Sequence, residues 1–178
     1  MARLILLNGP PGIGKSTLAR QYLGDHPMTL LIEIDGLRAA MGGWAQHEES
    51  KLQARVLALE LARVHLATGH DVAIPQYLGR PGFIDQLEAV AAEVDATFDH
   101  VVLSHDHDEV AQRFRSRRTQ LDDGDVQHPQ ADVGGDEIDA EVADAQLRLA
   151  NLVSSRPGIH IVDMRVPDPY ELLIGVLS

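Results

Sequence analysis

The sequence of 178 residues contains no cysteine, and Lys15 and Lys51 are its only lysines. The absence of cysteine excludes disulfides, thiolate zinc sites, iron–sulfur clusters and a cysteine nucleophile. The length matches one domain, with enough chain to bury a core without covalent crosslinks. We therefore predict that residues 1–178 form a single domain.

Long apolar runs are also missing. The run Leu4–Leu7 is too short for the core of a signal peptide and leads directly into Gly-Pro-Pro-Gly. No stretch approaches the roughly 20 apolar residues that a membrane helix needs. We therefore expect a cytoplasmic protein that does not associate with membranes, as a monomer or a homodimer.

The net charge of −12 combines 15 Lys and Arg residues with 27 Asp and Glu residues. This balance argues against a long nucleic acid as partner, because such binding needs a broad cationic face. The charge is uneven, since residues 119–147 contain nine acids and no Lys or Arg. Positive charge is concentrated at Lys15 and in the segment Arg113–Arg118, so a small phosphate site remains compatible with the composition.

Strand and helix patterns alternate along the chain, which is typical of a parallel α/β sandwich. Helix 48–67 is expected to bury a broad stripe that includes Leu52, Val56, Leu59 and Leu66. The polar, glycine-rich segment 119–135 is expected to be mobile. The predicted strands are 3–8, 28–35, 71–75, 98–104 and 159–164, and the predicted helices are 15–23, 48–67, 82–94, 106–118 and 169–177.

A phosphate-binding motif follows the first predicted strand. The segment Gly9-Pro-Pro-Gly-Ile-Gly-Lys-Ser-Thr17 fits the pattern G-x-x-x-x-G-K-[ST] between a strand and a helix. Its glycines let backbone N–H groups turn toward one anion, and the helix N-terminus adds a positive dipole end. Lys15 is expected to reach the β- and γ-phosphates, and Ser16 to ligate Mg²⁺. The residues predicted to bind nucleotide here are Gly9, Gly12, Ile13, Gly14, Lys15, Ser16 and Thr17.

Other nucleotide-binding classes fit less well. A dinucleotide fingerprint would need glycine at position 17, which is threonine. Guanine specificity would need an N-K-x-D element, and neither lysine lies in one. An AAA+ motor would need a Walker B acidic pair and a later sensor module, for which this length leaves no room. ATP is therefore the expected phosphate donor.

Two further motifs follow the P-loop along the chain. Asp35-Gly-Leu-Arg38 follows the second predicted strand, and Arg113-Phe-Arg-Ser-Arg117-Arg118 ends the helix after the fourth. With the P-loop, they make the chain resemble the small P-loop kinases, such as shikimate, gluconate and adenylate kinases. The resemblance implies a three-layer P-loop fold, a five-stranded parallel sheet in the order 2-3-1-4-5, and a small mobile lid at about 118–136.

The resemblance also implies roles for these residues. Asp35 would be the general base and Arg38 would bind the acceptor. Arg113 would pack on the adenine, and Arg117 would contact the transferred phosphoryl group. An Asp that caps the next helix, with Arg38 on its solvated face, explains the first motif as well. The arginine cluster also fits a basic helix C-terminus, although four arginines in six residues exceed that need.

The chain departs from the family pattern at Gln76, which stands where a metal-holding Asp is common at the end of the third strand. Magnesium would therefore depend on Ser16, phosphates and water. We expect Gln76, Trp44 and Arg80 to line the acceptor pocket, although a buried packing role explains Trp44 equally well. The histidines in the segment 100–107 match no zinc spacing and are interpreted as part of a solvated loop.

The sequence thus predicts an ATP-dependent phosphotransferase acting on a hydroxyl group of a small molecule. Its predicted catalytic residues are Lys15, Asp35 and Arg117. A 5′-hydroxyl polynucleotide kinase shares these motifs, although the acidic charge argues against it. A non-catalytic ATP-binding switch is the third alternative, and Gln76 favours it somewhat.

Overall fold

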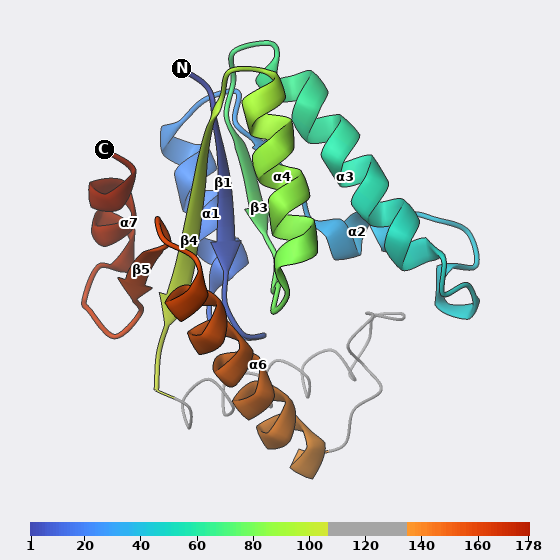
Figure 1. The fold of residues 1–178 in the computed structure, drawn as a ribbon, viewed down its shortest axis with the longest axis vertical. Coiled ribbons are helices and arrows are strands. Elements are labelled where there is room, and N and C mark those ends of the chain that lie inside the picture. The colour runs from blue at the N-terminus through green and yellow to red at the C-terminus, as the bar shows by residue number, and fades with distance from the viewer. Residues whose placement is uncertain (107–134) are drawn as a thin grey trace.

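The computed structural model describes residues 1–106 and 135–178. Its centre is one five-stranded parallel sheet in the order β2-β3-β1-β4-β5, which confirms the expected order. Because all strands run in the same direction, their carboxyl ends meet at one edge of the sheet (Figure 1). The strands are β1 (Arg3–Asn8), β2 (Leu30–Leu31), β3 (Val72–Pro75), β4 (Thr97–Ser104) and β5 (His160–Asp163).

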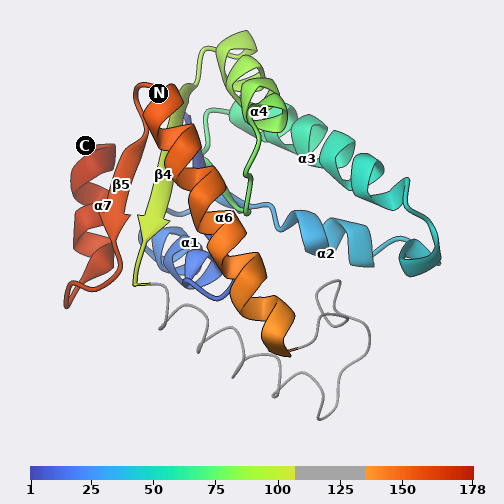
Figure 2. The same ribbon diagram turned by 60° about the horizontal axis from the view of Figure 1, so that its bottom comes forward.

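Helices cover both faces of the sheet, so the core has two apolar clusters. One cluster joins α3, α4 and α6 to alternate residues of β1, and the other joins α1 and α7 to the remaining ones. Figure 2 shows α6 crossing the β4 side of the molecule. The helices are α1 (Lys15–Asp25), α2 (Ile34–Ala39), η1 (Trp44–Gln46), α3 (Ser50–Leu66), α4 (Pro81–Glu93), α6 (Gly135–Ser155) and α7 (Pro169–Leu177).

The second predicted strand is wrong in its extent. β2 contains only Leu30 and Leu31, and the helix α2 begins at Ile34. Ile32 and Ile34 are both buried, at 2% and 6% exposure. Because these buried residues are two positions apart, they resemble the alternation of a strand, although β2 ends before them and α2 begins at Ile34. Asp35 therefore lies in the first turn of a helix rather than at a strand end.

The predicted apolar stripe of α3 is wrong in part, since Leu66 is buried as predicted but Leu52 and Val56 are not. The buried face of this helix consists of Ala54, Ala58 and Ala62, followed by Leu66. These alanines at i, i+4 spacing let the helix backbone approach the sheet and its neighbouring helices closely. Leu52 and Val56 are 65% and 51% exposed instead.

The predicted helix 106–118 and the predicted lid lie almost entirely outside the described residues. Only Gly135 and Asp136 of the lid range are described, and both belong to α6. None of the helices in residues 1–106 and 135–178 combines the length and the hydropathy that a membrane span requires.

Candidate functional site

The loop between β1 and α1 has the backbone that its glycines predict. Gly12 and Gly14 have φ angles of 81° and 107°, which side chains other than glycine adopt rarely. A Cβ atom at Gly9 would lie 2.9 Å from Cγ2 of the buried Ile13. α1 begins at Lys15 directly after Gly14. The loop therefore places a helix N-terminus beside a turn of backbone amides, which is the arrangement that binds phosphate.

Lys15 lies across this loop. Its Nζ donates hydrogen bonds of 2.9 Å to the carbonyl oxygens of Gly9 and Pro10. The ammonium group is therefore held at the loop, where its charge favours an anion bound to the amides.

A cleft of about 620 Å³ brings several predicted residues together. Its walls include Lys15 and Ser16 from the P-loop, Asp35 from α2, and Gln76 from the end of β3. Gln76 is fixed beside β1, because its backbone N–H donates to the carbonyl oxygen of Leu7 at 3.1 Å. The remaining predicted residues on its walls are Gly12, Gly14 and Thr17.

Arg20 and Glu33 also line the cleft and were not predicted from the sequence. They form an ion pair of 2.9 Å between α1 and the residue that precedes α2. The spacing Glu33-x-Asp35 was the available signal, since it places two carboxylates in one short segment. This exposed pair connects α1 to the residue two positions before Asp35.

Asn8, the last residue of β1, is another residue that sequence analysis missed. Its Oδ1 accepts hydrogen bonds from the backbone N–H groups of Gly9 and Leu78, each at 2.9 Å. Its Nδ2 donates to the carbonyl oxygen of Leu78 at 2.9 Å and lies 3.2 Å from Nε2 of His100. All four hydrogen-bonding positions of this buried amide are used. Asn8 therefore ties the first P-loop glycine to the segment after β3.

His100 is buried in β4, at 3% exposure, and does not belong to a solvated loop as the sequence analysis expected. Burial is the main cause that lowers its pKa to about 4, and the charge of Arg156 adds to the effect. The neutral ring can accept a hydrogen bond from Asn8 through Nε2, whereas the protonated ring cannot. His107 lies outside the described residues.

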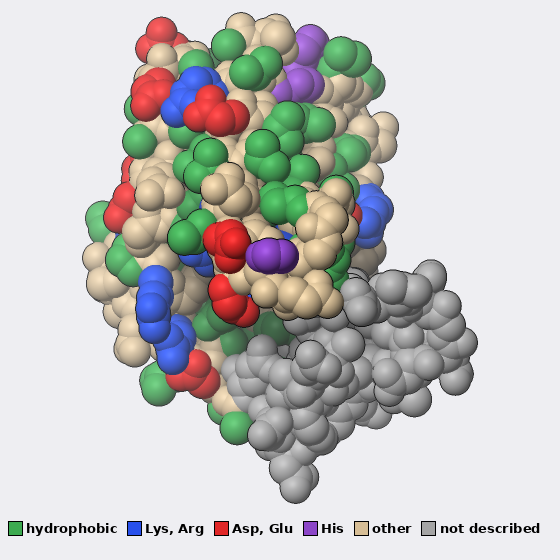
Figure 3. Space-filling model, turned by 90° about the vertical axis from the view of Figure 1, so that its right-hand side faces the viewer, with side chains coloured by type: hydrophobic (Ala, Val, Ile, Leu, Met, Phe, Trp, Pro, Cys, Tyr) green, Lys and Arg blue, Asp and Glu red, His purple; other side chains and the backbone are tan. Residues whose placement is uncertain are grey.

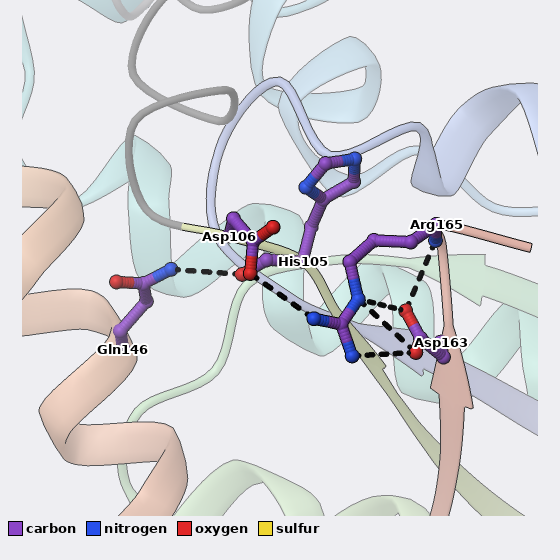
Figure 4. A network of polar contacts seen from close by, with 5 residues as sticks. All are labelled: His105, Asp106, Gln146, Asp163 and Arg165. Carbon is purple, nitrogen blue, oxygen red and sulfur yellow. Dashed lines mark hydrogen bonds and ion pairs between the residues drawn. The ribbon is translucent and has the colours of Figure 1, made fainter.

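A polar network lies at the same edge of the sheet, beside the ends of β4 and β5 (Figure 4). The guanidinium of Arg165 contacts Asp163 at 2.7 Å and Asp106 at 3.2 Å, so it joins the ends of both strands. Hydrogen bonds from Arg165 lower the pKa of Asp163 to about 2. Gln146 of α6 donates to the carbonyl oxygen of His105 at 3.4 Å. This network therefore ties the segment that follows β5 to the segment that follows β4.

The other predicted site residues lie apart from the P-loop cleft or outside the described residues. Arg38 is buried, donates to Oγ of Ser50 at 2.9 Å and lies 4.8 Å from the ring of Trp44. Arg80 precedes α4 and lines a second cavity. Arg113 and Arg117 lie outside the described residues.

The cleft has the donor atoms that Mg²⁺ prefers, namely the hydroxyl oxygen of Ser16 and the carboxylates of Asp35 and Glu33. Within the part of the chain that the structure describes, no three His, Asp or Glu side chains converge as a metal-binding group. A magnesium ion would therefore depend on phosphate oxygens and water together with these few protein ligands.

Comparisons with known proteins agree with this geometry. A family model described as an AAA domain matches residues 4–135. No curated protein matches the sequence. The description does not by itself indicate a motor, because Gln76 rather than an acidic pair follows β3.

Solved structures with a similar fold include a gluconokinase from Sinorhizobium meliloti 1021, at 17% identity and a TM-score of 0.59, covering 97% of this chain and 88% of that one. The tunicamycin resistance protein of Deinococcus radiodurans is similar at 17% identity and a TM-score of 0.60, covering 99% and 94%. The Pnkp1/Rnl/Hen1 RNA repair complex contains a chain similar at 18% identity and a TM-score of 0.66, covering 84% and 46%. At these identities the likenesses show the fold alone.

Proposed function

The chain belongs to the AAA domain family, with a P-loop kinase-like fold, and from this premise we propose that it transfers the γ-phosphoryl group of ATP to a hydroxyl group of a small molecule. The observation that carries the proposal is the shared cleft. A carboxylate, Asp35, lines the same space as Lys15 and Ser16. Phosphoryl transfer needs this combination of phosphate binding and a group that receives the hydroxyl proton.

Each group in the cleft has a defined role in the bond changes of this reaction. The bond between the γ-phosphorus and its bridging oxygen to the β-phosphate breaks, and a bond to the acceptor oxygen forms. The acceptor's proton passes to Asp35, and ADP leaves. The P-loop amides and Lys15 stabilise the charge on the phosphoryl oxygens. Mg²⁺, which Ser16 would hold, supplies further neutralisation of phosphate charge when bound.

The resemblance to small P-loop kinases adds two residues beyond the described part of the chain. In this proposal Arg113 packs on the adenine and Arg117 contacts the transferred group. The segment at about 118–136 serves as the lid that excludes water from the bound ATP.

The test compares Asp35→Asn with the wild type in ATP-dependent transfer to a library of hydroxyl compounds, read by mass spectrometry. Loss of a general base lowers the turnover rate by roughly 100-fold or more. ATP affinity should stay nearly unchanged, because Asp35 is assigned to the acceptor. Asp95→Asn is the matched control, since Asp95 is exposed and precedes β4 at the opposite edge of the sheet. Transfer at the wild-type rate by Asp35→Asn would refute the assignment.

A non-catalytic ATP-binding switch is favoured by one observation, the presence of Gln76 instead of a carboxylate beside the P-loop. Such a protein would bind ATP tightly, hydrolyse it slowly and phosphorylate no member of the library. The same experiment therefore separates the two functions.

A further inference from the structure

A second cavity, of about 900 Å³, lies between α3, α4 and α6. One part of its lining is the segment from Tyr77 to Arg80, which directly follows Gln76 of the P-loop cleft. A Cβ atom at Gly79 would lie 2.6 Å from the hydroxyl oxygen of Tyr77 and 3.1 Å from Cδ of Arg148, so glycine lets both side chains pack against this segment. We call this cavity the arginine groove.

Two arginines of this groove have no acidic partner. Among the described residues, neither Arg55 nor Arg80 forms an ion pair with a carboxylate. In a chain of net charge −12 this is unusual, since nearly every other described arginine contacts an acid. The arginines paired with acids are Arg3, Arg20, Arg63, Arg148, Arg156 and Arg165.

The groove also has apolar walls. The guanidinium carbon of Arg55 lies 5.3 Å from the centre of the Phe83 ring, which holds this charge against an apolar surface. Leu52 and Val56 of α3 line the groove and are more than half exposed. Figure 3 shows hydrophobic side chains gathered on the face that α3 presents. Cavities of this size, with a few polar groups among apolar ones, are typical of sites for small molecules.

The groove and the P-loop are held in a fixed relation. Asn8 bonds the backbone of Gly9 in the P-loop and both the N–H and C=O groups of Leu78, which lines the groove. A molecule in the groove would therefore lie at a fixed place relative to bound phosphates. Gln76 of the P-loop cleft and Tyr77 of the groove are also neighbours in the chain, so the groove is a candidate for the acceptor site.

We propose that the acceptor is an organic anion with an apolar part, whose carboxylate or phosphate pairs with Arg55 and Arg80 while its hydrophobic portion contacts Leu52, Val56 and Phe83. The inference rests on the proposed function, since it names the substrate class of that reaction. Arginine suits this task, because its planar fork binds both kinds of anion in a bidentate manner.

The test measures binding by calorimetry, and transfer from radiolabelled ATP, with matched pairs of hydroxyl compounds. The pairs are 3-phenyllactate against 3-phenylpropane-1,2-diol, and uridine 5′-monophosphate against uridine. Gluconate serves as an anion without an apolar part. We expect at least one ring-bearing anion to bind the wild type about tenfold or more tightly than its neutral counterpart and than gluconate, as charge-assisted hydrogen bonds imply. The pair that shows the preference distinguishes a carboxylate from a phosphate.

The double variant Arg55→Gln/Arg80→Gln should lose this tenfold preference while its ATP affinity stays unchanged. Arg63→Gln is the matched control, because Arg63 lies on the same helix but pairs with Glu60 and Glu93. Thermal unfolding of each variant shows whether it is folded. If no anion binds better than its neutral counterpart, or if the double variant keeps the preference, the inference is overturned.

The two proposals fail in different ways. Anion binding that the double variant loses, with no transfer of phosphate to any compound of these pairs or of the library, would contradict the kinase function, and the groove would then be an anion site but not an acceptor site. Transfer to a neutral alcohol at a rate equal to that of its anion would contradict the groove and support the kinase function.

Discussion

At the scale of single residues, the P-loop motif predicted residues that line the cleft but not Asn8, the side chain that joins the P-loop to the segment after β3. Lys15 and Ser16 were predicted from the P-loop motif and Asp35 from the resemblance to small P-loop kinases, and all three line one cleft. Asn8 precedes the motif and carries no chemistry of its own. Its importance depends on Leu78 and His100, which are distant in sequence, so only the folded chain shows it.

His100 gives the site a stability that depends on pH. Its folded-state pKa of about 4 lies below the ordinary histidine value of 6.5, because burial disfavours the charged ring. The unfolded chain therefore binds this proton more readily than the folded one. The resulting stability is fully present above pH 6.5 and is lost as the pH falls toward 4. Linkage makes the loss about 3 kcal/mol at most.

The measurement is the free energy of unfolding in urea between pH 7.5 and pH 4, for the wild type and His100→Gln. Gln has no titration in this range, and its side-chain oxygen can replace Nε2 as the acceptor for Asn8. The free energy of unfolding of the wild type minus that of His100→Gln should fall by about 2–3 kcal/mol between pH 7.5 and pH 4. Subtraction cancels contributions of carboxylates such as Asp163, whose lowered pKa of about 2 places its effect at lower pH. Parallel curves would contradict the prediction.

At the scale of elements, the sequence predicted the strands best where they are buried on both faces. β1 and α7 have the predicted limits, because an uninterrupted apolar run ending in glycine and a Pro start signal are local features. The helix α3 was predicted, but most of its buried face was not, and the reason is physical. Its leucines are more hydrophobic than Ala54, Ala58 and Ala62, yet close packing of a helix requires the small residues. Hydrophobicity alone could not reveal that choice.

The helix α7 provides a prediction at this scale. Asp168 is its N-cap, and its Oδ1 accepts hydrogen bonds from the backbone N–H groups of Tyr170 and Glu171 at 3.0 and 3.2 Å. Asp168→Ala leaves these donors without their partner and should lower the free energy of unfolding by about 1 kcal/mol. Asp168→Ser restores an acceptor and should recover most of the loss. Equal stability of the alanine and serine variants in urea titrations would show that the cap contributes nothing.

At the scale of the whole molecule, the charge of −12 is a property of particular regions rather than of the site. Most described arginines are neutralised by nearby acids, as in the contacts of Arg156 with Asp85 and Glu88. The described arginines without an acidic partner, Arg38, Arg55 and Arg80, all belong to the part of the chain that follows β2 and precedes β4. Within residues 1–106 and 135–178, the exposed arginines without an acidic partner are therefore two, Arg55 and Arg80.

The small number of unpaired arginines predicts slow transfer of phosphate to a nucleic acid. A polynucleotide is bound by displacing counterions along several phosphates, which a groove with two unpaired arginines cannot do. A 5′-hydroxyl oligonucleotide should therefore accept phosphate from ATP at least about 100 times more slowly than the best small anion. The gain in rate between 150 and 50 mM salt reports the number of phosphate contacts, and we expect a shallow slope that corresponds to about two contacts or fewer. Efficient transfer to the oligonucleotide with a steep salt dependence would show instead that residues beyond the described part of the chain complete a cationic channel, and the substrate would then be a nucleic acid.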